Sequence, residues 1–146
     1  MKRIVIATDG SASAWAAVEE GLELASEVGA EVTFVTVRHG VHLLGDPWYQ
    51  RHVTEQLGHA RDALDRAEAE ATRRGIPCDS EILEGDPASC ISDAALYRDA
   101  DLLVVGSRGH GAVTSALIGS VSRALMSRSP VPVMVVRERA RERSGA

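Results

Sequence analysis

The run Asp101-Leu-Leu-Val-Val-Gly-Ser-Arg-Gly109 joins a strand-like apolar segment to the first glycines of a loop. Its apolar part is unbroken, as in the strands of parallel sheets that are covered on both faces. Nine residues separate Gly109 from Gly119-Ser120, and the residues after that pair have the apolar spacing of a short helix. This order of a buried strand, a glycine-rich loop and a helix start indicates an α/β domain.

The segments on either side of this run alternate in the same way. Short apolar or β-branched runs predict strands, and repeats at helical spacing between them predict helices. Five strands and four helices in alternation predict one domain at 1–137, an open parallel sheet with helices on both faces, followed by a charged tail at 138–146. The strands are expected at 4–8, 31–37, 78–83, 101–105 and 131–136, and the helices at 14–28, 57–71, 87–95 and 121–125.

Turn and cap residues set the expected boundaries. Gly29 is placed to end the first helix. Asp86 and Pro87 fit the N-cap and first position of the third helix. Residues 40–53 contain Gly45-Asp46-Pro47 and no clear period, which predicts a long loop. The third strand alternates only weakly, which places it nearer a sheet edge.

The charge pattern excludes several functions. The 146 residues carry 16 basic and 21 acidic side chains, net −5, and Lys2 is the only lysine. No Walker lysine or interior Schiff-base lysine is therefore available. An acidic chain is also a poor general binder of nucleic acid. Residues 1–101 hold nine basic and nineteen acidic side chains, net −10, whereas 102–137 hold four arginines and no acid.

Cysteine and hydropathy patterns suggest the compartment. Cys78 and Cys90 form no CxxC pair, and two cysteines cannot build a metal site alone. The first apolar run is too short for a signal peptide, and no apolar stretch reaches the length of a membrane span. We therefore expect a cytoplasmic protein with no membrane partner.

The glycine-rich stretch carries the groups that phosphate binding needs. Gly106 and Gly109 would let the backbone approach an anion without an intervening Cβ. Gly119-Ser120 would open a helix whose N–H groups and dipole attract anions. The hydroxyls of Ser120 and Ser122 could donate hydrogen bonds, and Arg108 could donate a charge-assisted one.

The spacing Gly-x2-Gly-x9-Gly-Ser after a buried fourth strand resembles the nucleotide-binding motif of the universal stress protein family. The stretches Ile4-Val-Ile-Ala-Thr-Asp-Gly-Ser11 and Ser129-Pro-Val-Pro-Val-Met-Val-Val136 resemble that family's first and last strands, so the resemblance covers residues 2–137. It implies a Rossmann-like sheet of order 3-2-1-4-5 and a stress-response regulator that binds ATP with a divalent metal, Mg²⁺. It also implies a homodimer through the last strand, Val131 to Val136.

Carried over by position, the resemblance implies a binding site formed by two groups of residues. Ala7, Thr8 and Asp9 would contact adenosine, and Val37 would line the adenine pocket. The residues around the ribose and phosphates would be Gly106, Arg108, Gly109, Gly119, Ser120, Val121 and Ser122.

Other interpretations stand beside this one. Asp9 could only start a turn or cap the first helix, and Arg108 could be a solvated loop cation. A slow ATP hydrolase is the alternative function, with His110 as the only imidazole in the loop; we assign no catalytic residue and no metal ligand. No lysine follows the last strand, which excludes a receiver domain, and a dinucleotide site has weak support because no GxGxxG follows the first strand.

Overall fold

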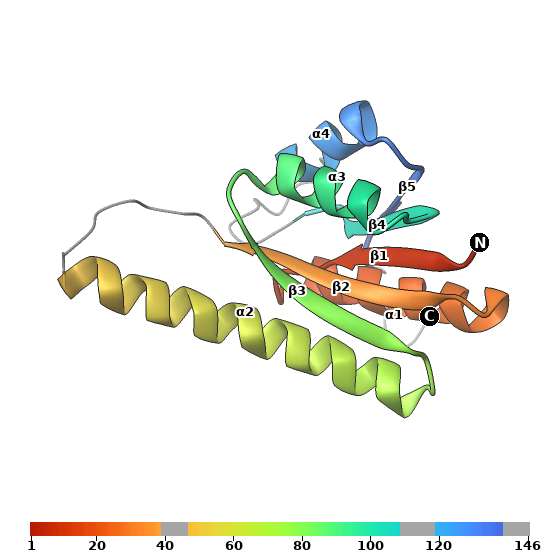
Figure 1. Ribbon diagram of the computed structural model, residues 1–146, viewed down its shortest axis with the longest axis horizontal. Coiled ribbons are helices and arrows are strands. Elements are labelled where there is room, and N and C mark those ends of the chain that lie inside the picture. The colour runs from red at the N-terminus through yellow and green to blue at the C-terminus, as the bar shows by residue number, and fades with distance from the viewer. Residues whose placement is uncertain (39–46, 109–118, 139–146) are drawn as a thin grey trace, which may run out of the picture.

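The computed structural model describes residues 1–38, 47–108 and 119–138 (Figure 1). A parallel sheet has the order β3-β2-β1-β4-β5, so the expected Rossmann-like topology is confirmed. The strands are β1 (Arg3–Ala7), β2 (Glu31–Arg38), β3 (Cys78–Glu84), β4 (Leu102–Gly106) and β5 (Val133–Val136). The helices are α1 (Ala12–Val28), α2 (Pro47–Arg73), α3 (Pro87–Tyr97) and α4 (Ser120–Arg128).

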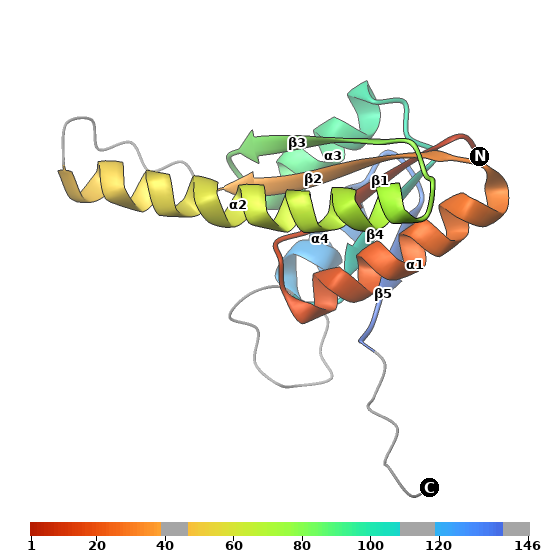
Figure 2. The same cartoon turned by 90° about the horizontal axis from the view of Figure 1, so that it is seen from below.

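Helices cover both faces of the sheet. Alternate residues of β1 point to opposite faces, so Ile4 and Ile6 pack with α1 and α2, whereas Val5 packs with α3 and α4. Figures 1 and 2 show these two layers on either side of the strands. Leu102–Val105 of β4 are buried, as an apolar run in a central parallel strand requires.

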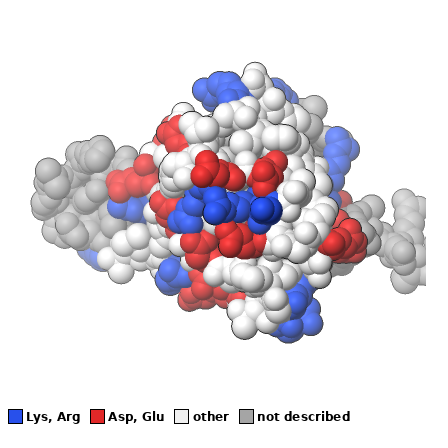
Figure 3. Space-filling model, turned by 45° about the vertical axis from the view of Figure 1, so that its right-hand side comes forward, with Lys and Arg blue, Asp and Glu red and all other residues white. Residues whose placement is uncertain are grey.

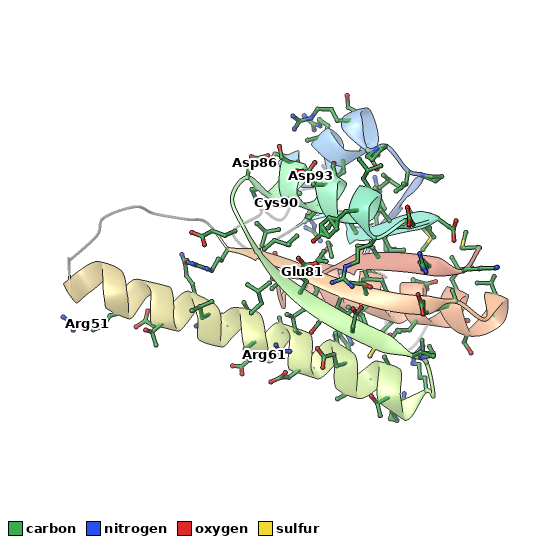
Figure 4. The ribbon with its side chains drawn as sticks, viewed as in Figure 1. Arg51, Arg61, Glu81, Asp86, Cys90 and Asp93 are labelled. Atoms are coloured by element: carbon green, nitrogen blue, oxygen red, sulfur yellow. The ribbon has the colours of Figure 1, made fainter. Side chains whose placement is uncertain are left out.

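The expected caps are present. Gly29 ends α1 in the left-handed region, with a φ of 70°. Asp86 accepts a hydrogen bond from the Ser89 N–H at 3.0 Å and caps α3, and Pro87 occupies the first turn. Because α3 starts directly after β3, its N-terminus lies at the carboxyl edge of the sheet (Figure 4).

Two boundaries differ from expectation. The loop predicted at 40–53 is wrong over its second part, because α2 begins at Pro47; residues 40–46 lie outside the described residues. Proline favours the first helical turn, and the turns after it extend past the carboxyl ends of the strands (Figures 1 and 2), where no sheet packing imposes an apolar period. The last strand begins at Val133 instead of Val131, since Pro132 has no N–H to donate to a ladder.

Candidate functional site

A pocket of about 510 Å³ opens at the carboxyl edge of the sheet, over the ends of β1, β2 and β4. β1 and β4 are neighbours there, and the chain leaves them toward opposite faces, which is the switch point where open α/β sheets bind ligands. Every described residue that the sequence assigned to the site lines this pocket; Gly109 and His110 lie outside the described residues. The assigned lining residues are Ala7, Thr8, Asp9, Val37, Gly106, Arg108, Gly119, Ser120, Val121 and Ser122.

The end of β1 is a tight turn. The Thr8 N–H donates to the Val35 carbonyl oxygen at 2.9 Å, which is the last link to β2 before the chain turns away. Asp9 Oδ1 accepts from the Ser11 N–H at 2.9 Å, and Gly10 has a φ of 82°. Asp9 therefore does start a turn, while the cap of α1 is Ser11, whose hydroxyl accepts from the Ala14 N–H. This turn fixes the Asp9 carboxylate at the pocket wall.

β2 continues past β1 and adds backbone polar groups to the pocket. The β1 pairing ends at Ala7 opposite Val35, but β2 runs on to Arg38. Backbone groups of a strand alternate sides, so the N–H and carbonyl of Val37 face the same way as those of Val35, toward β1. A donor and an acceptor on the same residue in this position can read the edge of a planar base.

The chain that follows β4 is tied to the start of α4. The Ser107 carbonyl oxygen accepts from the Gly119 N–H at 2.6 Å, so the segment between them leaves and returns at one point. The Ser122 hydroxyl donates to the Gly106 carbonyl oxygen at 2.5 Å, and Ser122 is almost fully buried. The Ser122 hydroxyl proton is therefore engaged within the protein in this structure.

Gly106 is required by a close approach of α1. A Cβ built there would lie 2.7 Å from the carbonyl carbon and oxygen of Ser13. Its φ lies outside the left-handed region, because the positive-φ glycines of the described chain are Gly10, Gly29, Gly75 and Gly85. The glycine that opens the loop therefore lets helix α1 pack on β4, in addition to any role toward an anion.

The N-terminus of α4 differs from the starts of α1 and α3. Those two helices are capped by the side chains of Ser11 and Asp86, whereas the N-cap of α4 is Gly119, which has no side chain to accept a hydrogen bond. The first bond within α4 runs from the Arg123 N–H to the Gly119 carbonyl oxygen at 3.0 Å. The N–H groups of residues 120–122 precede it and lie on the pocket, which makes this turn suited to an anion.

Two charged side chains line the described part of the pocket, Asp9 and Arg108. The Arg108 guanidinium lies 3.7 Å from a carboxylate oxygen of Glu138, which follows β5. Because the opposite charges of Asp9 and Arg108 nearly cancel, attraction for an anion must come largely from the helix dipole and backbone N–H groups. A divalent ion would find one carboxylate here, Asp9, and no group of three potential metal ligands occurs among the described residues.

A second pocket, of about 380 Å³, lies over the amino ends of β1–β3 and is saturated with internal ion pairs. Arg98 binds Asp79 and Glu81 (2.9 Å to the latter), and Figure 3 shows arginines between carboxylates on this face. Partial burial opposes ionisation of Asp79, but hydrogen bonds from Thr33 and Arg98 outweigh it and lower the Asp79 pKa. The arginine Arg98 of this second pocket is thus already paired with carboxylates of the same chain.

The thiols offer no nucleophile. Cys90 lies near Asp86 and Asp93 at the start of α3 (Figure 4), half-buried, with its Sγ 3.4 Å from the Glu84 carbonyl oxygen. Burial and these two carboxylates raise the pKa of the Cys90 thiol. A thiol with a raised pKa stays protonated near neutral pH and is a poor nucleophile.

Sequence reasoning missed several residues of the pocket wall. Thr36 precedes Val37 on β2, and Pro87 and Ile91 belong to the first turns of α3. The helix start at Asp86-Pro87 was the available signal, since it places α3 at the carboxyl edge of the sheet where the site lies.

Among the helices of the described residues, none combines the length and the apolar composition of a membrane span.

Known proteins share both the sequence and the architecture of this domain. The Universal stress protein family matches residues 1–137. The chain belongs to this family. A universal stress protein of Thermus aquaticus is 38% identical over 138 residues, which is 93% of this chain and 98% of the relative.

Solved structures of the family agree with the fold. A universal stress protein family member from Burkholderia pseudomallei superposes with a TM-score of 0.77 at 30% identity, covering 92% of this chain and 95% of its own. A universal stress protein in complex with cAMP gives a TM-score of 0.74 at 26% identity, covering 94% and 98%. Proteins of this family take part in stress responses.

Proposed function

We propose that this universal stress protein binds ATP at the carboxyl edge of its sheet and regulates through nucleotide-dependent conformation or partner binding. The observation that carries the proposal is the turn of α4 without a side-chain cap, whose N–H groups face a pocket of about 510 Å³. A pocket of this size suits a small-molecule ligand. The relative in complex with cAMP supports an adenine nucleotide as the ligand class.

The nucleoside would bind at the β1–β2 side of the pocket. Adenine presents an amino donor beside a ring-nitrogen acceptor, which complements the carbonyl and N–H of Val37. Guanine presents an acceptor beside a donor at the same edge and would be disfavoured, because buried polar groups would be left unpaired. Asp9 would accept hydrogen bonds from the ribose or base, with Ala7 and Thr8 beside it.

The phosphates would bind between β4 and α4. The backbone N–H groups of residues 120–122 would donate to phosphate oxygens, and Ser120 would add its exposed hydroxyl. Arg108 would exchange its pairing with Glu138 for a phosphate. Gly106 would meet the ligand through its backbone, since Ser13 fills the space of its missing Cβ, and Gly109 and Gly119 would leave space for the phosphates. This site would work without a lysine, since Lys2 is the only lysine of the chain.

Magnesium fits this donor set only as a companion of the nucleotide. Mg²⁺ is commonly bound by one or two carboxylates together with substrate phosphates and water. Asp9 is the carboxylate that lines the described pocket wall. The ion would therefore be held mainly by the phosphates of ATP and would neutralise part of their charge.

The experiment that tests this function measures bound and added nucleotide. Purified protein is heat-denatured and the supernatant chromatographed for adenine nucleotides, and ATP with Mg²⁺ is titrated by calorimetry. We expect either adenine nucleotide in the supernatant or ATP binding with a dissociation constant in the millimolar range or tighter. No nucleotide in the supernatant and no heat at millimolar ATP would refute the proposal.

A pair of glycine variants locates the site. Gly119→Val places a branched side chain at the turn where the phosphates would bind; a Cβ there already lies 3.3 Å from the Ser107 carbonyl oxygen. We expect it to abolish ATP binding while the far-ultraviolet circular dichroism of the chain stays unchanged. Gly58→Val is the matched control, because Gly58 lies on α2 with open space around its Cβ position. Normal ATP binding by Gly119→Val would show that the phosphate site is wrongly assigned.

We also propose a homodimer through β5 and a cytoplasmic location. β5 is an edge strand of the sheet and pairs with β4 on one side. An exposed edge is a template for pairing with a second strand. Both cysteines are free thiols, which fits a reducing compartment.

A further inference from the structure

Ser13 joins the first turn of α1 to the chain that follows β4. Its side chain is buried, with 2% of the residue exposed. Its Oγ accepts a hydrogen bond from the Arg108 N–H at 3.0 Å and lies 3.5 Å from the Ser107 Oγ. Ser13 is separated by more than ninety residues from both partners and does not line the pocket.

The close packing at Gly106 makes this contact possible. Because position 106 has no Cβ, the backbone of α1 at Ser13 approaches β4 closely enough for its hydroxyl to reach the next two residues of the chain. Ser13 also lies two residues after Ser11, whose N–H is held by Asp9. The serine therefore connects the turn at the nucleoside side of the pocket to the segment at its phosphate side.

We infer that Ser13 is a positioning residue for phosphate binding, acting through the backbone of Arg108 and not by contact with the ligand. The inference rests on the proposed function. With its N–H held by Ser13, Arg108 begins the loop from a fixed point, and the bond between Ser107 and Gly119 fixes the other end. Such preorganisation raises affinity because Arg108 and Gly119 lose less freedom when the ligand binds between them.

The Ser13→Ala variant should weaken ATP binding selectively. Alanine leaves the partly buried Arg108 N–H without its Ser13 acceptor, so the backbone at Arg108 would relax toward water or another partner. We expect the affinity for ATP to fall about tenfold, as the loss of one buried hydrogen bond predicts. The affinity for adenosine, which carries no phosphates, should change by less than about twofold.

Ser11→Ala is the matched control. The Ser11 hydroxyl caps the same helix by accepting from the Ala14 N–H, whereas the Arg108 N–H is held by Ser13, so loss of the Ser11 hydroxyl destabilises α1 without releasing Arg108. We expect a lower melting temperature and an unchanged ratio of ATP to adenosine affinity. A role of Ser13 in folding alone would give Ser13→Ala this same pattern, and equal losses for the two ligands would overturn the inference.

A measurement on the wild-type chain keeps the inference testable if Ser13→Ala fails to fold. Amide hydrogen exchange of Arg108, followed by NMR without nucleotide, should be slowed at least about tenfold relative to an open loop amide. Exchange at the rate of an unprotected amide would refute the anchoring role, whatever the ligand. Absence of ATP binding to the wild type would instead refute the proposed function, and the Arg108 exchange result would then still report whether the anchor exists.

Discussion

Replacing Gly106 with alanine should destabilise the fold, because the new methyl group meets backbone. A Cβ at this position would lie 2.7 Å from the Ser13 carbonyl carbon and oxygen and 2.8 Å from its Oγ. Ordinary contacts of a Cβ begin at 3.4 Å, so β4 and the first turn of α1 would have to separate by about 0.7 Å. Both elements are held there, by the Ser13 bond to Arg108 and by the central pairing of β4 with β1.

The expected loss follows from the cost of overpacking. An added methylene in a packed interior costs about 1–3 kcal/mol when backbone must shift. For a chain of 146 residues, each kcal/mol lowers the melting temperature by about 2–4 °C, so we expect a decrease of about 2–12 °C. Urea unfolding, followed by circular dichroism, gives the free energy directly.

Two other glycines calibrate this measurement. Gly119→Ala adds a Cβ at 3.3 Å from the Ser107 carbonyl oxygen with an ordinary φ of −64°, and should cost less than about 1 kcal/mol. Gly29→Ala meets open space but has a φ of 70°, so its cost of about 1 kcal/mol would be backbone strain alone. A Gly106→Ala variant as stable as wild type, or more stable than Gly119→Ala, would refute the close-approach argument.

Three further predictions concern charge and assembly. Hydrogen bonds from two arginines in the next turn lower the Glu70 pKa from 4.5 to about 2. The stability that the Glu70 carboxylate adds is therefore present above pH 4.5 and lost as pH falls toward 2. The stability of Glu70→Gln should depend less on pH in that window. Burial and the hydrogen bond to Glu81 raise the Tyr97 pKa to about 12. In a pH titration, the wild type should therefore gain phenolate absorbance near pH 12 that the Tyr97→Phe variant lacks. A difference between the two proteins that appears near pH 10 would contradict this. The backbone groups of residues 132 and 136 face β4, so the N–H of Val135 lies on the outer side of β5, and Val135→Pro removes it. Light scattering should then show a weakened dimer with the fold retained. An intact dimer would place the interface elsewhere.

Local chemistry made most of the fold predictable, and its limit is visible in one repeated tripeptide. Gly85-Asp86-Pro87 was recognisable as a helix start because an inward-facing apolar stripe follows it. Gly45-Asp46-Pro47 has the same three residues, but the sequence that follows it shows no apolar period, and the first turns of α2 extend past the carboxyl ends of the strands (Figure 1). An apolar period arises where a helix packs against the rest of the protein. The part of a helix that extends beyond the sheet lacks this period, although the proline that begins the helix is still present.

The site was predictable in outline for a related reason. The carboxyl ends of parallel strands meet at one edge, so the residues after β1 and β4 had to converge. The sequence could not reveal that Gly106 serves the approach of α1, or that Ser13 lies against Arg108, because both depend on how far apart two elements settle in three dimensions.

The hydrogen bond from Gly119 to Ser107 has a consequence for how this domain can change over time. Because the two ends of this segment are joined by a hydrogen bond, changes in its length or sequence need not move the strand before it or the helix after it. Loop-closure entropy rises slowly, by about 0.6 kcal/mol for each doubling of length, so insertions and new side chains between these residues are thermodynamically inexpensive. Variation in ligand or partner preference can therefore accumulate in this segment while β4, α4 and the rest of the sheet stay as they are.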